Sequence, residues 1–198
     1  MEKIQILLKL AAFLIGSLTL TFILNKAMQK RDFRVQAAVN FAVISTLTCI
    51  LFLIGGFSVW TVKGVIMAFI LLYASVQDIS THEADDRLWI MLLILSLVDF
   101  SSTRILSMFV GGLTVFIPQL AVAILGKIGG IGGADIKLST AAAIVCGFIG
   151  GAIGYVIGLL FAIVFQSIGN KIKGKTNKEP FALIPFISAG LMLGYFLS

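Results

Sequence analysis

Two aspartates at the edges of long apolar segments are the residues of this chain best suited to chemistry. Asp135 follows the glycine-rich stretch 129–133 and precedes an apolar segment, and Asp78 follows the apolar segment 62–76. A carboxylate at the bilayer centre costs about 2.5–3.5 kcal/mol on insertion scales, so such residues usually mark a function. We therefore take Asp78 and Asp135 as the candidate catalytic pair.

Two carboxylates held close together cannot both ionise easily, so the pair would share a proton near neutral pH. One carboxylate can then activate a water molecule while the other protonates a carbonyl oxygen or a leaving amine. This chemistry hydrolyses peptide bonds and needs neither a metal nor another cofactor. The glycines before Asp135 carry no side chains, so a substrate backbone or the Asp78 helix could approach closely.

Each aspartate also has a plainer interpretation. Asp135 could be a helix N-cap, with Lys137 as an anchor at the membrane interface, and Asp78 could be an ordinary loop residue. Intramembrane carboxylates also mark ion paths, as in a small transporter. A transporter predicts further polar residues deep in the apolar segments, and these are few, mainly Asn40 and Gln119.

The elements that must position these aspartates are membrane-spanning helices. Of the 198 residues, 59% are hydrophobic and 12% are charged, and the mean hydropathy is +1.09. Soluble domains have about 45–50% apolar and about 25% charged residues. The apolar runs are continuous and do not alternate with a period of two, which argues against a β-barrel. We expect an all-α, polytopic membrane protein that contacts the lipid bilayer.

About eight transmembrane helices are expected from the apolar segments. Two of them lie in an N-terminal part, 1–61, and six form a core, 62–198. Glycines at helical spacing in the C-terminal third should form a close-packed helix face. The expected spans are 4–24, 37–54, 62–76, 88–98, 105–125, 136–148, 152–168 and 181–197.

The net charge of +6 reflects membrane topology and does not indicate nucleic acid as a partner. With eight spans, the alternate loops 25–36, 77–87, 126–137 and 169–179 share one side and hold most of the basic residues. By the positive-inside rule that side is cytoplasmic, and it carries both Asp78 and Asp135. These basic residues are Lys26, Lys30, Arg31, Arg34, Arg87, Lys127, Lys137, Lys171, Lys173, Lys175 and Lys178. The opposite side carries Lys3, Lys63 and Arg104.

Metal ligands are scarce in the sequence. The two cysteines, Cys49 and Cys146, are separate and lie inside apolar runs, and His82 is the only histidine. We therefore expect neither a disulfide framework nor a metal site.

Around the two aspartates the sequence resembles the type IV prepilin peptidase family, membrane aspartyl proteases with a GxGD motif. The second family motif stands here as Gly132-Gly133-Ala134-Asp135-Ile136-Lys137-Leu138, with Ala134 where the family has glycine. The first motif stands as 78–86, an acidic segment that lacks the family's proline and most of its basic residues. A weaker match is the proline-phenylalanine element at 179–186. The resemblance covers about residues 62–198.

The resemblance implies an aspartic endopeptidase of the bacterial or archaeal cytoplasmic membrane, with Asp78 and Asp135 as its catalytic residues. Such enzymes cut the short basic leader from type IV prepilin-like proteins of pilus and secretion systems, at the cytoplasmic membrane face. The cysteine-bearing domain that accompanies N-methylation in larger members is absent, so a short, protease-only form is expected. A catalytically silent assembly factor is the alternative, because the first motif is altered. Nothing in the sequence indicates an oligomeric state.

Candidate substrate-binding residues follow from the same segments. The acidity of the first motif predicts that Glu83 and Asp86 attract the basic leader, and a solvated acidic loop is the plainer interpretation. Gly132 and Gly133 would admit the substrate backbone, and Lys137 occupies the family position beside the catalytic aspartate.

Overall fold

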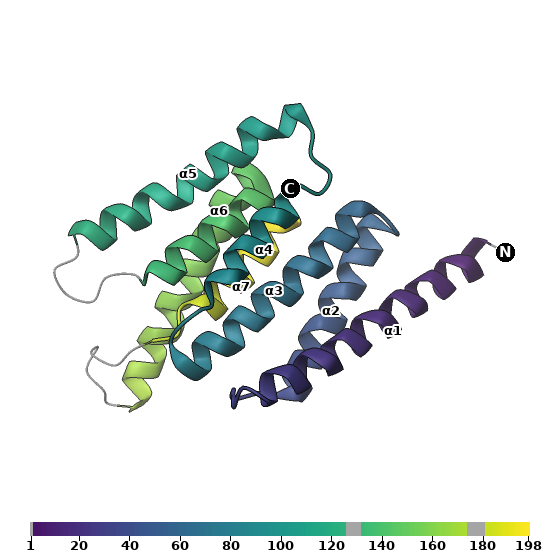
Figure 1. Cartoon of the computed structure of the whole chain (residues 1–198), viewed down its shortest axis with the longest axis horizontal. Coiled ribbons are helices and arrows are strands. Elements are labelled where there is room, and N and C mark those ends of the chain that lie inside the picture. The colour runs from purple at the N-terminus through teal and green to yellow at the C-terminus, as the bar shows by residue number, and fades with distance from the viewer. Residues whose placement is uncertain (1, 126–131, 174–180) are drawn as a thin grey trace.

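The computed structural model describes residues 2–125, 132–173 and 181–198, and these residues form an all-α structure (Figure 1). By helix length and composition, the chain is a multi-pass membrane protein. The helices are α1 (Glu2–Gln29), α2 (Ala37–Gly55), α3 (Val59–Thr81), α4 (Asp86–Ser96), α5 (Ser102–Leu125), α6 (Gly133–Lys173) and α7 (Ile184–Tyr195).

The expected number of eight transmembrane helices is wrong. The described residues form seven helices, and five of these are long and apolar enough to cross a membrane. These five are α1, α2, α3, α5 and α6. The difference in number arises where separate spans were expected at 136–148 and 152–168. Those two segments are counted together as α6, which joins two helical arms across a kink at Gly147. Helices α4 and α7 are too short to be among the five.

Helix α6 nevertheless turns back on itself at Gly147. The φ of this residue is 75°, a left-handed value that glycine adopts without a steric penalty. In a straight helix, residues eight apart are separated by about 12 Å. A Cβ atom built on Gly151 would instead lie 2.9 Å from the carbonyl oxygen of Ala143. The two arms of α6, 133–146 and 148–173, therefore lie side by side (Figure 1).

A glycine face on the second arm of α6 receives α7. A Cβ atom on Gly154 would lie 2.7 Å from the carbonyl oxygen of Gly190, and one on Gly158 would lie 2.7 Å from the Cα atom of Ile187. Any larger side chain would push the two backbones apart. The predicted close-packed helix face is thus confirmed at these positions, and α7 is held there by backbone-to-backbone packing.

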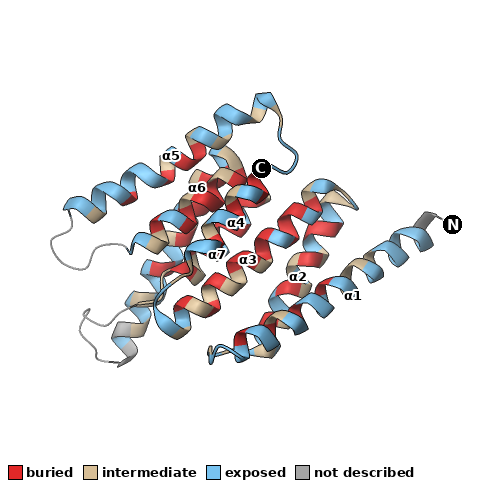
Figure 2. Cartoon of the chain, viewed as in Figure 1, coloured by how far each residue is buried: buried red, intermediate tan, exposed pale blue. Residues whose placement is uncertain are grey.

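Helix α3 lies at the centre of the structure. It is the most buried of the five candidate spans and α1 the least (Figure 2). It packs against α2, α4 and α7, and its core side chains include Met67, Leu71 and Ala74. The C-terminal end of α3 therefore brings its side chains into the interior, between α4 and α7. The division of the chain at residue 61 stays a prediction, since α2 packs directly on α3.

The polar residues noted deep in the apolar segments join helices. The amide of Asn40 on α2 donates a hydrogen bond of 2.7 Å to the side-chain oxygen of Asn25 on α1. Both residues are buried, so this bond ties the exposed α1 to the rest of the protein. Gln119 has a comparable role beside Asp135.

Candidate active site

Asp78 lies near the C-terminal end of α3, and only 5% of its surface is exposed. Its Oδ2 atom accepts a hydrogen bond of 2.9 Å from the backbone N–H of Ile184, the first residue of α7. The first N–H groups of a helix have no partner in their own helix, so this carboxylate satisfies one of them. The same bond holds the carboxylate of Asp78 in one place.

Asp135 lies in the first turn of α6, in the arm that precedes Gly147, and is partly buried. Gly132 lies directly against it, because a Cβ atom on this glycine would come within 3.0 Å of the Oδ2 atom of Asp135. The absence of a side chain at position 132 therefore keeps one side of the carboxylate open. Gly133 starts the helix, is exposed, and has open space where a side chain would lie.

The two aspartates share one region of the protein. Asp78, at the end of α3, lies near enough to Asp135, at the start of α6, for the two charges to interact. Helix α7 packs against both α3 and α6 and so connects the elements that carry the pair. The arrangement can perform acid–base chemistry on a bond placed between the two carboxylates.

Gln119 fixes the backbone beneath Asp135. Its amide Nε2 atom donates a hydrogen bond of 2.6 Å to the hydroxyl of Ser139, which donates one of 2.6 Å to the carbonyl oxygen of Asp135. Gln119 and Ser139 are each 1% exposed. This buried chain of hydrogen bonds ties α5 to the first turn of α6.

The predicted substrate-binding residues have different environments in the structure. Glu83 is exposed, in the segment between α3 and α4. Asp86 starts α4 and accepts hydrogen bonds from Lys137 (2.8 Å) and from the indole of Trp89 (3.1 Å). The hydrogen bonds from Lys137 and Trp89 hold the pKa of Asp86 below its ordinary value. The ion pair is therefore present at neutral pH and is lost only as the pH falls through that lowered pKa.

The Lys137–Asp86 ion pair joins the second motif to the first. The ammonium of Lys137 also lies 5.9 Å from the centre of the Trp89 ring, which favours a cation in that position. Both ionic side chains are largely exposed, so solvent screens the pair and it contributes little to stability. Its main effect is to hold α4 beside the start of α6.

Sequence reasoning missed Tyr155 and the N–H of Ile184. Tyr155, on the second arm of α6, is buried and lies near enough to Asp135 for the charge of that carboxylate to act on it. A tyrosine inside an apolar segment was a usable signal, because its hydroxyl needs a polar neighbour. Pro185, in the first turn of α7, marked where that helix begins. No sequence pattern showed that the first N–H of α7 reaches Asp78.

Parts of the predicted motifs lie outside the described residues. These are Gly129 and Gly130 of the glycine-rich stretch, Glu179 and Pro180 of the proline-phenylalanine element, and the basic residues Lys127, Lys175 and Lys178. Within the residues that the structure describes, no three His, Cys, Asp or Glu side chains gather as the ligands of a metal ion would.

Comparison with known proteins gives one match. The profile of the type IV leader peptidase family matches residues 65–168, which is more than half of the chain and includes both aspartates. No curated protein and no solved structure gives a significant match.

The bond between Asp78 and Ile184 predicts different stabilities for two substitutions. Asp78→Ala leaves a buried N–H without an acceptor and should lower the free energy of unfolding by about 1–3 kcal/mol. Asp78→Asn keeps an acceptor oxygen and should stay close to the native value. Thermal unfolding of the purified protein in detergent measures both, with the exposed Glu83→Ala as the control. Equal unfolding temperatures for the two Asp78 variants would contradict this role.

Proposed function

This chain belongs to the type IV leader peptidase family, and on that premise we propose that it cuts type IV prepilin-like proteins with an Asp78/Asp135 carboxylate pair. The product would be the mature protein, freed of its short basic leader. The observation that carries the proposal is the packing of α3, α4, α6 and α7, with the Lys137–Asp86 ion pair between α6 and α4. This packing brings Asp78, at the end of α3, to the same end of the protein as Asp135, at the start of α6, although the two residues are 57 positions apart (78 and 135).

The proposed reaction is general acid–base hydrolysis. One carboxylate, ionised, removes a proton from water, and the water oxygen attacks the scissile carbonyl carbon. The other carboxylate, protonated, donates its proton to the carbonyl oxygen, which gives a tetrahedral diol. As the C–N bond breaks, the first carboxyl passes the proton it took from water to the leaving amine, and a diol hydroxyl returns a proton to the second carboxylate. The bond from Ile184 and the contact with Gly132 hold the two carboxylates in position and leave space beside Asp135.

The other function classes have less support in the structure. A transporter requires polar groups that line a path through the membrane. Deep polar residues are few, and the two main ones, Asn40 and Gln119, are both engaged in contacts between helices. A catalytically silent assembly factor would retain the fold but would leave the leader uncut.

Asp78→Asn and Asp135→Asn should each abolish leader removal, because either change removes a proton-transfer group worth at least about 100-fold in rate. The measurement is the gel shift of a type IV prepilin co-expressed with each variant, with immunoblots to show equal amounts in the membrane. Asp32→Asn is the matched control. Asp32 is an exposed carboxylate, and asparagine tolerates the left-handed backbone of this position. Normal processing by either active-site variant would rule out the aspartyl mechanism.

The acidic segment between α3 and α4 supports recognition of a basic leader. Glu83 is exposed there, whereas Asp86 is already paired with Lys137. We therefore assign the contact with leader charge mainly to Glu83, and a supporting role to Asp86 and Lys137, which hold α4 beside Asp135. Gly132 and Gly133 would leave room for the substrate backbone.

Glu83→Gln should raise KM for a basic leader by up to about fivefold and leave kcat nearly unchanged, as expected for one exposed ion pair. Steady-state cleavage of a leader peptide by the purified protein gives both constants. A leader whose lysines are replaced by glutamine should remove the difference between the native protein and this variant. An equal KM with the basic leader would leave Glu83 as a solvated loop residue.

We also propose that the end of the molecule with Asp78 and Asp135 faces the cytoplasm. Support comes from basic residues in or beside the helix ends here, such as Lys26, Arg31 and Arg87, against Lys63 and Arg104 at the other end. The peptide bond would then be cut at the cytoplasmic membrane face.

A single cysteine at position 83, in a chain without Cys49 and Cys146, should react with a membrane-impermeant maleimide only after the cells are opened. Intact cells and inverted membrane vesicles give the comparison, and a cysteine at position 101, near the opposite end, is the matched control with the reverse pattern. Labelling of position 83 in intact cells would reverse the proposed orientation.

A further inference from the structure

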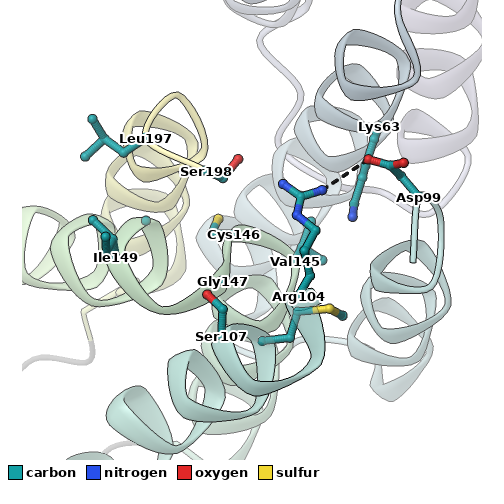
Figure 3. Close-up of a pocket in the computed structure, with 12 residues that line it drawn as sticks. Lys63, Asp99, Arg104, Ser107, Val145, Cys146, Gly147, Ile149, Leu197 and Ser198 are labelled. Atoms are coloured by element: carbon teal, nitrogen blue, oxygen red, sulfur yellow. Dashed lines mark hydrogen bonds and ion pairs between the residues drawn. The ribbon is translucent and has the colours of Figure 1, made fainter. Parts of the chain in front are cut away.

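A cavity of about 150 Å³ lies at the end of the molecule opposite the two aspartates (Figure 3). Lys63, near the start of α3, lines it. Asp78 is 15 residues further along the same helix, which corresponds to about 22 Å. The cavity is therefore separate from the candidate active site, and an inference about it does not rest on the proposed function.

The ionic side chains that line this cavity carry one more positive charge than negative charge. Lys63, Arg104 and Asp99 all line it. Arg104 forms an ion pair of 3.1 Å with Asp99, drawn as a dashed line in Figure 3. Among the ionic side chains that line the cavity, two cations and one carboxylate give a net charge of +1.

Lys63 is buried with hydrogen-bonding capacity to spare. It is 6% exposed, and its ammonium donates one hydrogen bond of 3.0 Å to the carbonyl oxygen of Val98. An ammonium carries three donors, so two remain for another acceptor. A buried ammonium is costly unless it is paired and fully hydrogen-bonded. In Figure 3 the side chains of Lys63 and Arg104 extend into the same space, where one anion could contact both.

The turn of α6 adds further donors to the cavity. The second arm of α6 starts after Gly147, and its first-turn residues Ile149 and Gly150 line the cavity. N–H groups in a first helical turn lack partners and attract anions. The hydroxyl oxygen of Ser107 accepts a bond of 3.0 Å from the N–H of Phe148, which leaves the hydroxyl hydrogen free to donate.

We propose that this cavity binds a singly charged phosphate group, supplied either by the phosphodiester of a lipid headgroup or by free inorganic phosphate. One negative charge balances the net charge of the three ionic residues. Lys63, Arg104 and Ser107 donate to the phosphate oxygens, and the first turn of the second arm of α6 supplies backbone N–H groups. On the same measure of volume one water needs about 10–15 Å³, so a tetrahedral oxyanion fits.

The first experiment follows thermal unfolding of the full-length protein in detergent as inorganic phosphate is added, with sodium chloride holding the ionic strength constant. A ligand of the folded state raises the unfolding temperature in a saturable way. Arg104→Gln and Ser107→Ala should each weaken the binding of phosphate, and the loss of affinity should be about tenfold for Arg104→Gln. Lys171→Gln is the matched control, since it removes one exposed positive charge elsewhere on α6.

Asp99→Asn should strengthen phosphate binding, an effect that a loss of folding cannot produce. It removes the carboxylate that competes for Arg104, and asparagine tolerates the left-handed backbone of position 99, where φ is 59°. The half-saturating phosphate concentration should fall in this variant.

A second titration distinguishes the sources of the phosphate group. Mixed micelles with phosphatidylglycerol are compared with micelles that contain diacylglycerol, which lacks the phosphate. Stabilisation by phosphatidylglycerol alone assigns the site to a lipid headgroup, and stabilisation by inorganic phosphate as well assigns it to the phosphate group itself. No stabilisation by either, or equal stabilisation of the native protein, Arg104→Gln and Ser107→Ala, would overturn the proposal and leave Lys63 and Arg104 as structural partners of Asp99.

Discussion

The hydrogen bond between Asp78 and the first N–H of α7 is the contact on which the rest of this structure depends. A carboxylate buried at the end of the central helix needs a polar partner, and α7 supplies one with its unpaired N-terminus. The bond requires α7 to begin beside α3. That position is set in turn by the glycines of α6, whose backbone touches the backbone of α7. The geometry around Asp78 is therefore built from close helix packing.

Much of this architecture could be predicted from local patterns in the sequence. Continuous apolar runs and low charge indicated an all-α membrane protein, and the motifs around Asp78 and Asp135 indicated the family that the profile match shows. The expected count differs at Gly147, where two apolar segments that were expected as separate helices are joined across a kink into α6. The reversal of the chain there depends on the left-handed backbone of one glycine, which the sequence pattern alone does not show.

The remaining parts of the site depend on contacts between distant segments. The bond from Ile184 to Asp78 joins residues 106 positions apart, and the Lys137–Asp86 pair joins residues 51 positions apart. Periodicity describes one helix at a time and contains no information about such pairs. The acidic segment after Asp78 was predicted either to attract the basic leader or to be a solvated loop. In the structure it is divided between the exposed Glu83 and an Asp86 that is bound to the second motif.

If leader cleavage were no longer selected, substitutions at the two aspartates would have different consequences for folding. Position 78 accepts a backbone hydrogen bond that starts a helix, so an acceptor of the size of aspartate or asparagine would still be needed for folding. The carboxylate of Asp135 lies against Gly132, the residue directly before α6. A descendant that kept the fold and abandoned the chemistry should therefore change first at position 135 and retain Asp or Asn at position 78.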